Sequence, residues 1–345
     1  MANKKSNEEP KVEMFQDEKT FLAHAKKEYG KLSVRDIDTV EDPKPNSTGS
    51  IMLDIDLKVP YPEGRIIEIY GPNQAGKTSI VLEALGQAQK AGKYVAFCDA
   101  EGKLTKSLVS GIRTINPLIE DEEGNKTFKI LKGRCGEENL NLVRDYVRSY
   151  PGSVVGIDSV DALVPENVLQ GDIGDSAVAD LAKLMSDGCR KLNEAVQKTK
   201  STILFINQMR NKITLFGDPR TTSGGEALGY YSDQRIVLSG VGKDQRVKGE
   251  GGKIIGHIAR YSIIKNKLSP PVEGSVRIIY GIGIHREWEL ARLLKDLGLV
   301  EAGGKGGHSL KIEGRVLTVD KTAALFEADP DLYTKYYEML MDCYK

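Results

Sequence analysis

The sequence predicts an α/β protein whose core is a doubly wound, mostly parallel β-sheet. Three observations lead to this fold class. A complete G-x-x-x-x-G-K-[ST] pattern runs from Gly71 to Thr78, between an apolar strand and a helix. From Ser47 onward, apolar β-branched segments alternate with segments of helical periodicity. Several apolar segments also end in polar residues, which gather at one edge of a parallel sheet.

The N-terminal region differs from this pattern. Residues 1–12 are polar, and residues 20–29 have apolar side chains at helical spacing. A proline-containing linker follows at 42–46. We therefore predict a helical arm, residues 1–46, that docks on its own domain or on a neighbouring subunit.

The predicted core, residues 47–284, contains strands at 65–70, 94–99, 127–131, 154–158 and 202–207. Helices are predicted at 79–91, 137–150 and 176–197. Beyond Tyr231 the segments 235–238, 254–265 and 275–280 are shorter, and they indicate antiparallel strands at the sheet's edge, the first two joined by a hairpin at 240–252. Residues 285–345 are expected to form a small α/β domain with helices at 287–297 and 322–343.

Composition is that of an ordinary globular protein, with 40% hydrophobic and 28% charged residues. Lys+Arg and Asp+Glu are both 49, so any DNA-binding surface must be local. The four cysteines are far apart and form no CxxC pair, which indicates reduced thiols. No apolar run approaches the ~18 residues of a membrane span, and the first twenty residues lack a signal-peptide core. We expect a cytoplasmic protein with no membrane partner.

The phosphate-loop pattern predicts nucleotide binding, with a purely structural glycine loop as the alternative. Backbone N–H groups at the start of the following helix would wrap the phosphates. Lys77 would contact the β- and γ-phosphates, and the Thr78 hydroxyl would bind Mg²⁺. The predicted nucleotide-binding residues are Gly71, Pro72, Asn73, Gln74, Ala75, Gly76, Lys77, Thr78 and Ser79.

Three polar residues follow apolar strands and are candidates for catalysis. Asp158 suits a carboxylate that supports Mg²⁺, and Glu101 could orient and deprotonate an attacking water. The Gln208 amide could sense the γ-phosphate and transmit its presence to the following loop. As alternatives, Glu101 only caps a loop, and Asp158 and Gln208 are only polar strand ends.

Basic residues near these strands suggest an anionic partner. Arg210 and Lys212 alternate on a glycine-containing loop, which suits DNA backbone contacts, although solvated loop charges give the same pattern. Lys265 and Lys267 are two residues apart and share one face of a strand. They would suit a triphosphate, or they protect an exposed sheet edge.

The chain from Ser47 onward resembles the bacterial RecA recombinase family. The resemblance rests on motifs that occur in the family's order and at nearly its spacing. These are Ser47-Thr48-Gly49-Ser50, Arg65-Ile66-Ile67-Glu68-Ile69-Tyr70-Gly71-Pro72, Asp99-Ala100-Glu101, Ile157-Asp158-Ser159-Val160, Gly174-Asp175-Ser176, Phe205-Ile206-Asn207-Gln208, Phe216-Gly217-Asp218-Pro219, Thr221-Thr222-Ser223-Gly224-Gly225 and Lys265-Asn266-Lys267.

The resemblance implies an ATP site with Mg²⁺ in which Glu101 activates water and Gln208 couples the γ-phosphate to DNA. Two DNA loops are implied, at 165–176 and 209–225. Lys265 and Lys267 would reach a neighbouring subunit's ATP, and Tyr280 its adenine. The implied DNA-binding residues are Lys183, Arg190, Arg210, Lys212, Ile213 (as a wedge between base triplets) and Arg260.

The function implied by the resemblance is ATP-dependent filament assembly on single-stranded DNA, followed by pairing and strand exchange with double-stranded DNA. A single-strand-binding protein or a loading mediator is a candidate partner. Two alternatives stay open: a RecA-like motor ATPase, such as a ring helicase or a RadA-type repair factor, and a nucleotide-regulated mediator with little hydrolysis. The sequence also departs from the family: Leu108 stands at a position where the family usually has an aromatic residue that stacks on adenine. Such departures indicate a divergent member of the family, and a viral origin is consistent with them.

Overall fold

The computed structural model describes residues 17–30, 34, 36–172, 178–211, 220–303 and 309–344. The chain divides into two compact units, Met1–Pro43 and Lys44–Lys345. In the first, helix α1 (Glu18–Tyr29) begins at Asp17, whose carboxylate accepts a hydrogen bond from the Thr20 backbone N–H at 2.7 Å. This helix confirms the one predicted at 20–29. Its apolar side chains Phe21, Leu22 and Tyr29 are exposed.

The start of the second unit is held by hydrogen bonds. The Glu63 N–H donates to the Lys44 carbonyl at 2.9 Å. The buried Asn46 amide donates to the Tyr61 carbonyl at 2.8 Å, and the Lys93 ammonium donates to Asn46 Oδ1 at 2.6 Å. The chain is therefore anchored to this unit from Lys44 onward.

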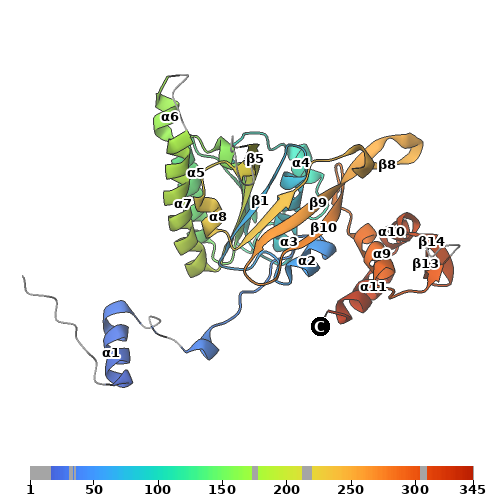
Figure 1. The fold of residues 1–345 in the computed structure, drawn as a ribbon, viewed down its shortest axis with the longest axis horizontal. Helices are drawn as coiled ribbons and strands as arrows, with labels where there is room; N and C mark the ends of the chain where they lie inside the picture. Colours follow the sequence, from blue (N-terminus) through green and yellow to red (C-terminus); the bar gives the residue numbers. More distant parts are fainter. Residues whose placement is uncertain are drawn as a thin grey trace, which may run out of the picture. The chain divides into compact units, whose positions relative to one another are not determined.

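A mixed, mostly parallel β-sheet forms the centre of the second unit (Figure 1). Within the described residues it has 11 strands, in the order β11-β10-β9-β7-β1-β5-β4-β2-β3, with β6 beside β5 and β8 beside β9. The strands of this path are β1 (Ile66–Gly71), β2 (Val95–Asp99), β3 (Phe128–Leu131), β4 (Val154–Asp158), β5 (Thr202–Asn211), β7 (Gln234–Leu238), β9 (Ile254–Asn266), β10 (Val272–Ile279) and β11 (Gly283–Ile284).

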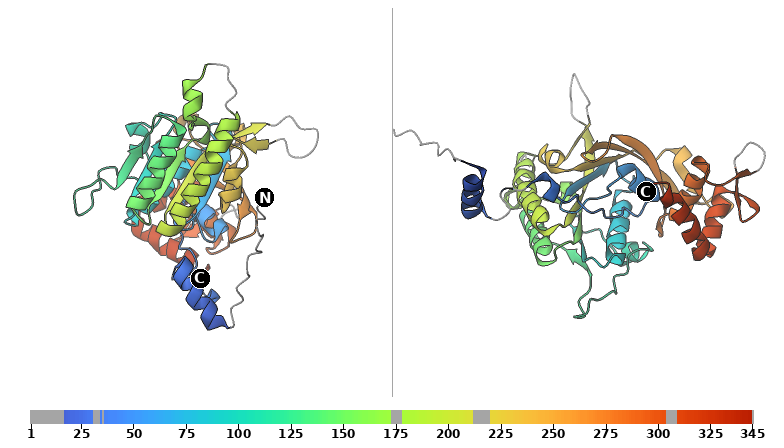
Figure 2. Two further views of the ribbon diagram at one scale, coloured as in Figure 1. Left: turned by 90° about the vertical axis from the view of Figure 1, so that its left-hand side faces the viewer. Right: turned by 90° about the horizontal axis from the view of Figure 1, so that it is seen from below.

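Helices cover both faces of this sheet, as the predicted doubly wound class requires. Alternate residues of β1 separate into two cores: Ile67 and Ile69 pack with α3 (Lys77–Lys90), whereas Ile66 packs with α5 (Gly136–Ser149) and α7 (Val178–Thr199). Figure 2 shows α5 and α7 as one layer in front of the sheet. These three helices confirm those predicted at 79–91, 137–150 and 176–197.

The antiparallel part of the sheet begins one strand later than predicted. β7 pairs in parallel with β1, through Ile67 with Gln234, and antiparallel with β9. The prediction of an antiparallel edge strand at 235–238 is therefore right for the pairing with β9 but wrong for the position at the edge, because local sequence does not encode which strand becomes a neighbour. The predicted hairpin at 240–252 lies between β7 and β9, and its β8 (Arg246–Lys248) pairs with β9.

The C-terminal part packs around an apolar cluster that has Leu290, Ile312 and Phe326 among its buried members and also includes Ile51. Buried Glu289 connects it to α2 (Ile51–Leu57): its carboxyl group accepts from Ser50 Oγ at 2.8 Å and from the Ile51 N–H at 2.7 Å. Burial raises the pKa of Glu289 to about 8. The elements of this part are α9 (Arg286–Asp296), β12 (Ala302–Gly303), β13 (Ser309–Ile312), β14 (Arg315–Thr318), α10 (Val319–Ala328) and α11 (Pro330–Asp342).

The single helix predicted at 322–343 is two helices. α10 ends at Ala328 and α11 begins at Pro330, with Asp329 between them as the N-cap of α11. Proline disfavours a helical conformation at the preceding residue, and the Asp329 carboxylate accepts from the Leu332 N–H at 3.0 Å. The proline therefore separates the helices, and Asp329 caps the second. The domain boundary between residues 284 and 285 stays a prediction.

Several short elements were not predicted, because one or two turns carry too little periodicity. These elements are η1 (Ile37–Thr39), α2, α4 (Lys106–Ser110), η2 (Val160–Ala162), α6 (Glu166–Gln170), β6 (Arg220–Thr222), α8 (Ala227–Tyr231), η3 (Lys243–Gln245), β8 and η4 (Glu250–Gly252).

Among the described residues, no helix has the length and apolar character needed to cross a membrane.

Candidate nucleotide-binding site

The phosphate loop connects the end of β1 to the start of α3, as the sequence predicts. Gly76 has φ 97°, a left-handed conformation that glycine adopts without strain. A Cβ at Gly76 would lie 2.4 Å from Ile278 Cδ1, so the loop also needs glycine for its close approach to β10. A cavity of about 390 Å³ opens against this loop, and it is lined by Gln74, Ala75, Gly76, Lys77, Thr78, Ser79, His257 and Tyr280.

Lys77 is only 8% exposed and folds back over the loop. Its ammonium donates to the Gly71 carbonyl at 2.9 Å and to the Pro72 carbonyl at 2.7 Å. Burial lowers the pKa of Lys77, and the nearby Asp158 and Glu101 carboxylates oppose that shift. These contacts hold a cation at the loop, where it can bind a polyphosphate.

Oxygen ligands suitable for Mg²⁺ meet beside this lysine. The Thr78 hydroxyl donates to Asp158 Oδ2 at 2.8 Å, although 80 positions separate them in the chain. Asp158 is the last residue of β4, and burial raises the pKa of its carboxyl group. A hydroxyl and a carboxylate fit the oxygen preference of Mg²⁺, so Thr78 and Asp158 could hold the ion.

Glu101 lies close to Asp158 because β2 and β4 are neighbours, with Asp99 and Asp158 paired in register. The carboxylate accepts from Ser159 Oγ at 3.0 Å and pairs with Lys103 Nζ at 2.7 Å. The hydrogen bond from Lys103 holds the pKa of Glu101 below its ordinary value. Glu101 is therefore ionised at neutral pH, the state that a general base needs.

Gln208 sits beside the phosphate loop. The parallel pairing of β1 with β5 places Gln208 in register with Gly71, the loop's first residue. Its neighbour Asn207 is fully buried, and Asn207 Oδ1 accepts from the Gln208 N–H at 2.8 Å. The role of Gln208 as a sensor of the γ-phosphate stays a prediction.

Asn207 links three parts of the site. Its amide donates to Glu68 Oε1 at 2.9 Å and to the Ser223 carbonyl at 3.1 Å. Glu68 is also buried and pairs with Arg235 at 2.6 Å. Ser223 Oγ in turn donates to Asp161 Oδ1 at 2.5 Å. The strand before the phosphate loop is thus joined to the far end of the predicted second DNA loop.

The basic residues predicted to bind DNA lie on several elements. Exposed Lys183 and Arg190 lie on α7, where Arg190 pairs with Asp187 at 2.7 Å. Exposed Arg260, on β9, pairs with Asp244 at 3.3 Å. Arg210 lies on β5 in register with Thr221 of β6, whereas Lys212 and Ile213 lie outside the described residues.

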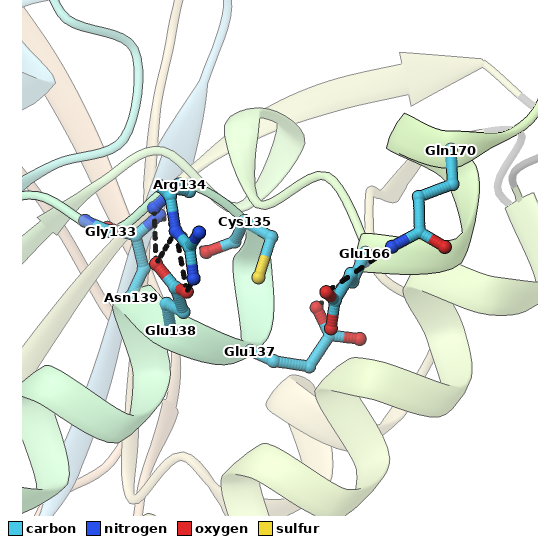
Figure 3. A network of polar contacts seen from close by, with 8 residues as sticks. All are labelled: Gly133, Arg134, Cys135, Glu137, Glu138, Asn139, Glu166 and Gln170. Carbon is cyan, nitrogen blue, oxygen red and sulfur yellow. Dashed lines mark hydrogen bonds and ion pairs between the residues drawn. The ribbon is translucent and has the colours of Figure 1, made fainter.

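The base of the predicted first DNA loop is fixed to α5 (Figure 3). The Glu166 N–H, at the start of α6, donates to Glu137 Oε2 at 2.9 Å, and Gln170 Nε2 donates to Glu166 Oε1 at 3.4 Å. A groove of about 680 Å³ between α5, α6 and α7 contains both Glu137 and Lys183. Lys183 therefore lies beside residues 165–170, the start of the predicted first DNA loop.

Lys265 and Lys267 lie far from the phosphate loop of their own chain. Lys265 is in register with Arg235 at the start of β7, near the opposite end of the sheet from Gly71. Its ammonium donates to the Gly229 carbonyl at 2.8 Å, and Lys267 pairs with Asp233. Both line one cavity of about 660 Å³. Tyr280, in contrast, lines the phosphate-loop cavity of the same chain, whereas we expected it to reach a neighbouring subunit.

Sequence reasoning missed His257, Asn207 and Asp161. Asn207 directly precedes Gln208, so its position next to a candidate sensor was a usable signal. Asp161 follows Asp158 by three residues, within the turn after the strand. His257 had no local signal, because a lone histidine in a strand is ordinary and only the packing of β9 under the loop brings it to the site.

Comparison with known proteins gives relatives over most of the chain. A family model of the RecA N-terminal domain matches residues 17–285. Protein RecA of Streptococcus mutans serotype c is 39% identical over 82% of this chain and 73% of that protein. Protein RecA of Chloroherpeton thalassium is 36% identical over 99% of this chain and 95% of its own length. Protein RecA of Streptococcus gordonii is 37% identical over 88% of this chain and 80% of its own length.

Proposed function

The chain belongs to the RecA family and has a RecA-type function in DNA recombination and repair, and from this premise we propose that it is a DNA-dependent ATPase. It assembles as a filament on single-stranded DNA with ATP and Mg²⁺, and it pairs that strand with homologous double-stranded DNA. The observation that carries this proposal is the register of Gln208 with Gly71, because it joins the nucleotide loop to the strand that leads into the second DNA loop.

In the proposed hydrolysis step, the loop and Lys77 bind the phosphates. Mg²⁺, held by Thr78 and Asp158, would neutralise charge that develops on the phosphate oxygens. Ionised Glu101 accepts a proton from the attacking water, and its contacts with Ser159 and Lys103 orient the carboxylate. Closure over the substrate would have to release Lys77 from the loop carbonyls it now contacts.

The proposed coupling to DNA runs through β5. Gln208 contacts the γ-phosphate, and Asn207 transmits its position to Ser223 through the 3.1 Å hydrogen bond. Residues of the loop between β5 and β6, with Arg210 and Lys212, then bind DNA phosphates. A shift of the strand end thus changes both sites at once, which is the requirement for linkage between two ligands.

Filament formation supplies the residues that this chain cannot offer to its own nucleotide. Lys265 and Lys267 lie at the opposite end of the sheet from Gly71, so we assign them to the ATP of a neighbouring subunit. The exposed Phe21, Leu22 and Tyr29 of α1 offer an apolar surface for packing against another protomer. Hydrolysis would then require assembly.

The test is ATP hydrolysis with and without single-stranded DNA, at low salt, beside Lys77→Ala. We expect strong stimulation by DNA in the unmodified protein and no hydrolysis in the variant. Electron micrographs of the same samples should show helical filaments on DNA. Hydrolysis that is indifferent to DNA, together with closed rings, would contradict the proposal and favour a ring motor.

A further inference from the structure

His257 is a buried polar residue at the nucleotide site to which the proposed function gives no role. It lies on β9, is 3% exposed, and lines the same 390 Å³ cavity as Lys77 and Thr78. Its pairing with Ile278 of β10 directs both side chains towards the loop, because a Cβ on Gly76 would lie 2.4 Å from Ile278 and 3.3 Å from His257 Nε2.

The two ring nitrogens of His257 differ in how well they are paired. Nδ1 lies 3.3 Å from the Tyr280 hydroxyl, and the two rings are 5.6 Å apart. Nε2 is buried and has no hydrogen-bond partner of good geometry in the described part of the chain. A buried polar atom without a partner is costly and uncommon, so a partner supplied by a ligand is a natural explanation.

The engaged nitrogen also determines where the proton lies. Burial lowers the pKa of His257, although a weak hydrogen bond between the ring and the Ala75 backbone opposes this shift, so the ring is neutral at physiological pH. When the Tyr280 hydroxyl donates to Nδ1, the single ring proton is on Nε2. Nε2 is then a hydrogen-bond donor that faces the phosphate loop.

We propose that His257 is a nucleotide-binding residue whose Nε2–H donates to a phosphate oxygen of the nucleoside di- or triphosphate in the loop. This inference rests on the proposed function, because it assumes that the loop binds a nucleotide. The Tyr280 hydroxyl keeps the ring in the donor tautomer, so Tyr280 is a positioning residue for the same contact.

The contact couples nucleotide binding to pH. A phosphate next to the imidazole raises its pKa, so the complex takes up a proton that the free protein does not hold. The contribution of His257 to the affinity should therefore increase as the pH falls from 8 to 6. Other charged or titratable groups near the ring are Lys77 on α3, Tyr280 after β10 and Arg246, which is in register with His257 on β8. None of these has an ordinary pKa between 6 and 8.

The test is calorimetric titration of full-length protein with ADP at pH 6, 7 and 8. His257→Leu removes the donor, whereas His257→Gln keeps an N–H donor without a titrating ring. At pH 7 we expect affinity to fall about tenfold in His257→Leu and by less than about threefold in His257→Gln. Both variants should lose the pH dependence specific to the imidazole. His285→Gln, which alters a histidine outside the loop cavity, is the matched control and should bind like the unmodified protein.

The outcomes separate the two ideas. ADP binding that is equal in all variants, with an unchanged pH dependence, would overturn the role of His257 and leave the nucleotide site intact. Unmodified protein that binds no ADP would overturn the proposed function and this inference together. If His257→Leu does not fold, the pH dependence of His257→Gln decides: a slope equal to that of the unmodified protein contradicts the proposal.

Discussion

Replacing Asn207 by alanine should weaken the coupling between the nucleotide site and DNA binding, while the phosphate loop stays intact. The side chain makes contacts of 2.9 Å to Glu68, 3.1 Å to the Ser223 carbonyl and 2.8 Å from the Gln208 N–H. The two neutral hydrogen bonds contribute about 1 kcal/mol each, and the one to the Glu68 carboxylate contributes about 2 kcal/mol. We expect a loss of about 4 kcal/mol in the free energy of unfolding, and a weaker link between Gln208 and the loop.

A buried asparagine elsewhere provides the control for that loss of stability. Asn139 on α5 is 4% exposed, accepts from the Gly133 N–H at 2.7 Å and donates to the Cys135 carbonyl at 2.9 Å. Asn139→Ala should also destabilise the fold, by about 2 kcal/mol, because its two backbone hydrogen bonds are neutral. It should leave the coupling between nucleotide and DNA unchanged.

The assay is steady-state ATP hydrolysis over a range of single-stranded DNA concentrations, at a temperature where both variants are folded by circular dichroism. Stimulation by DNA should fall at least about tenfold in Asn207→Ala, which corresponds to about 1.4 kcal/mol of coupling free energy. Hydrolysis without DNA should change less. Normal stimulation in Asn207→Ala, or an equal loss in Asn139→Ala, would refute the transmission through Asn207.

Three further predictions concern hydrolysis, pH and assembly. Glu101→Gln should retain ATP binding but lose about 10²–10⁴-fold in hydrolysis rate, and hydrolysis at the normal rate would exclude Glu101 as the base. Because the folded pKa of Glu289 is raised to about 8, the folded state binds the extra proton, and stability should fall as the pH rises from 5 to 8. Denaturant titrations should show a flatter pH profile for Glu289→Gln, and an unchanged profile would assign the dependence to another group. Finally, the double variant Lys265→Ala/Lys267→Ala and the variant Lys77→Ala should each be inactive alone. If the lysine pair acts on the ATP of a neighbouring subunit, a mixture of the two variants should regain hydrolysis. An inactive mixture would argue against that role.

The sheet and the phosphate loop could be predicted because their determinants are local. Glycines at fixed spacing specify the loop, and apolar runs that end in Asp158 and Gln208 specify strands whose ends meet beside it. The order of parallel strands then brings Thr78 within 2.8 Å of Asp158. Motif and spacing together thus predicted which elements surround the nucleotide site.

Features that depend on distant partners could not be predicted. The seven-residue α2 is too short for a periodicity argument, and its first turn is held by Glu289, 238 positions from Ile51. His257 faces the loop only because β9 and β10 pass beneath Gly76. The break at Asp329–Pro330 was different: proline marked it in the sequence, but apolar residues on both sides favoured one continuous helix.

The anchor at Lys44 limits how far the arm can extend. Glu63 and Asn46 fix the chain from Lys44 onward, so only residues 31–43 connect α1 to a rigid point. A connection of that length spans at most about 45 Å when fully extended. If α1 docks on another protomer, as proposed, its docking surface must begin within that radius of Lys44. Deleting residues from the connection would shorten this reach by about 3.5 Å for each residue removed, so the length of the connection would limit which surfaces of a neighbouring protomer α1 can contact.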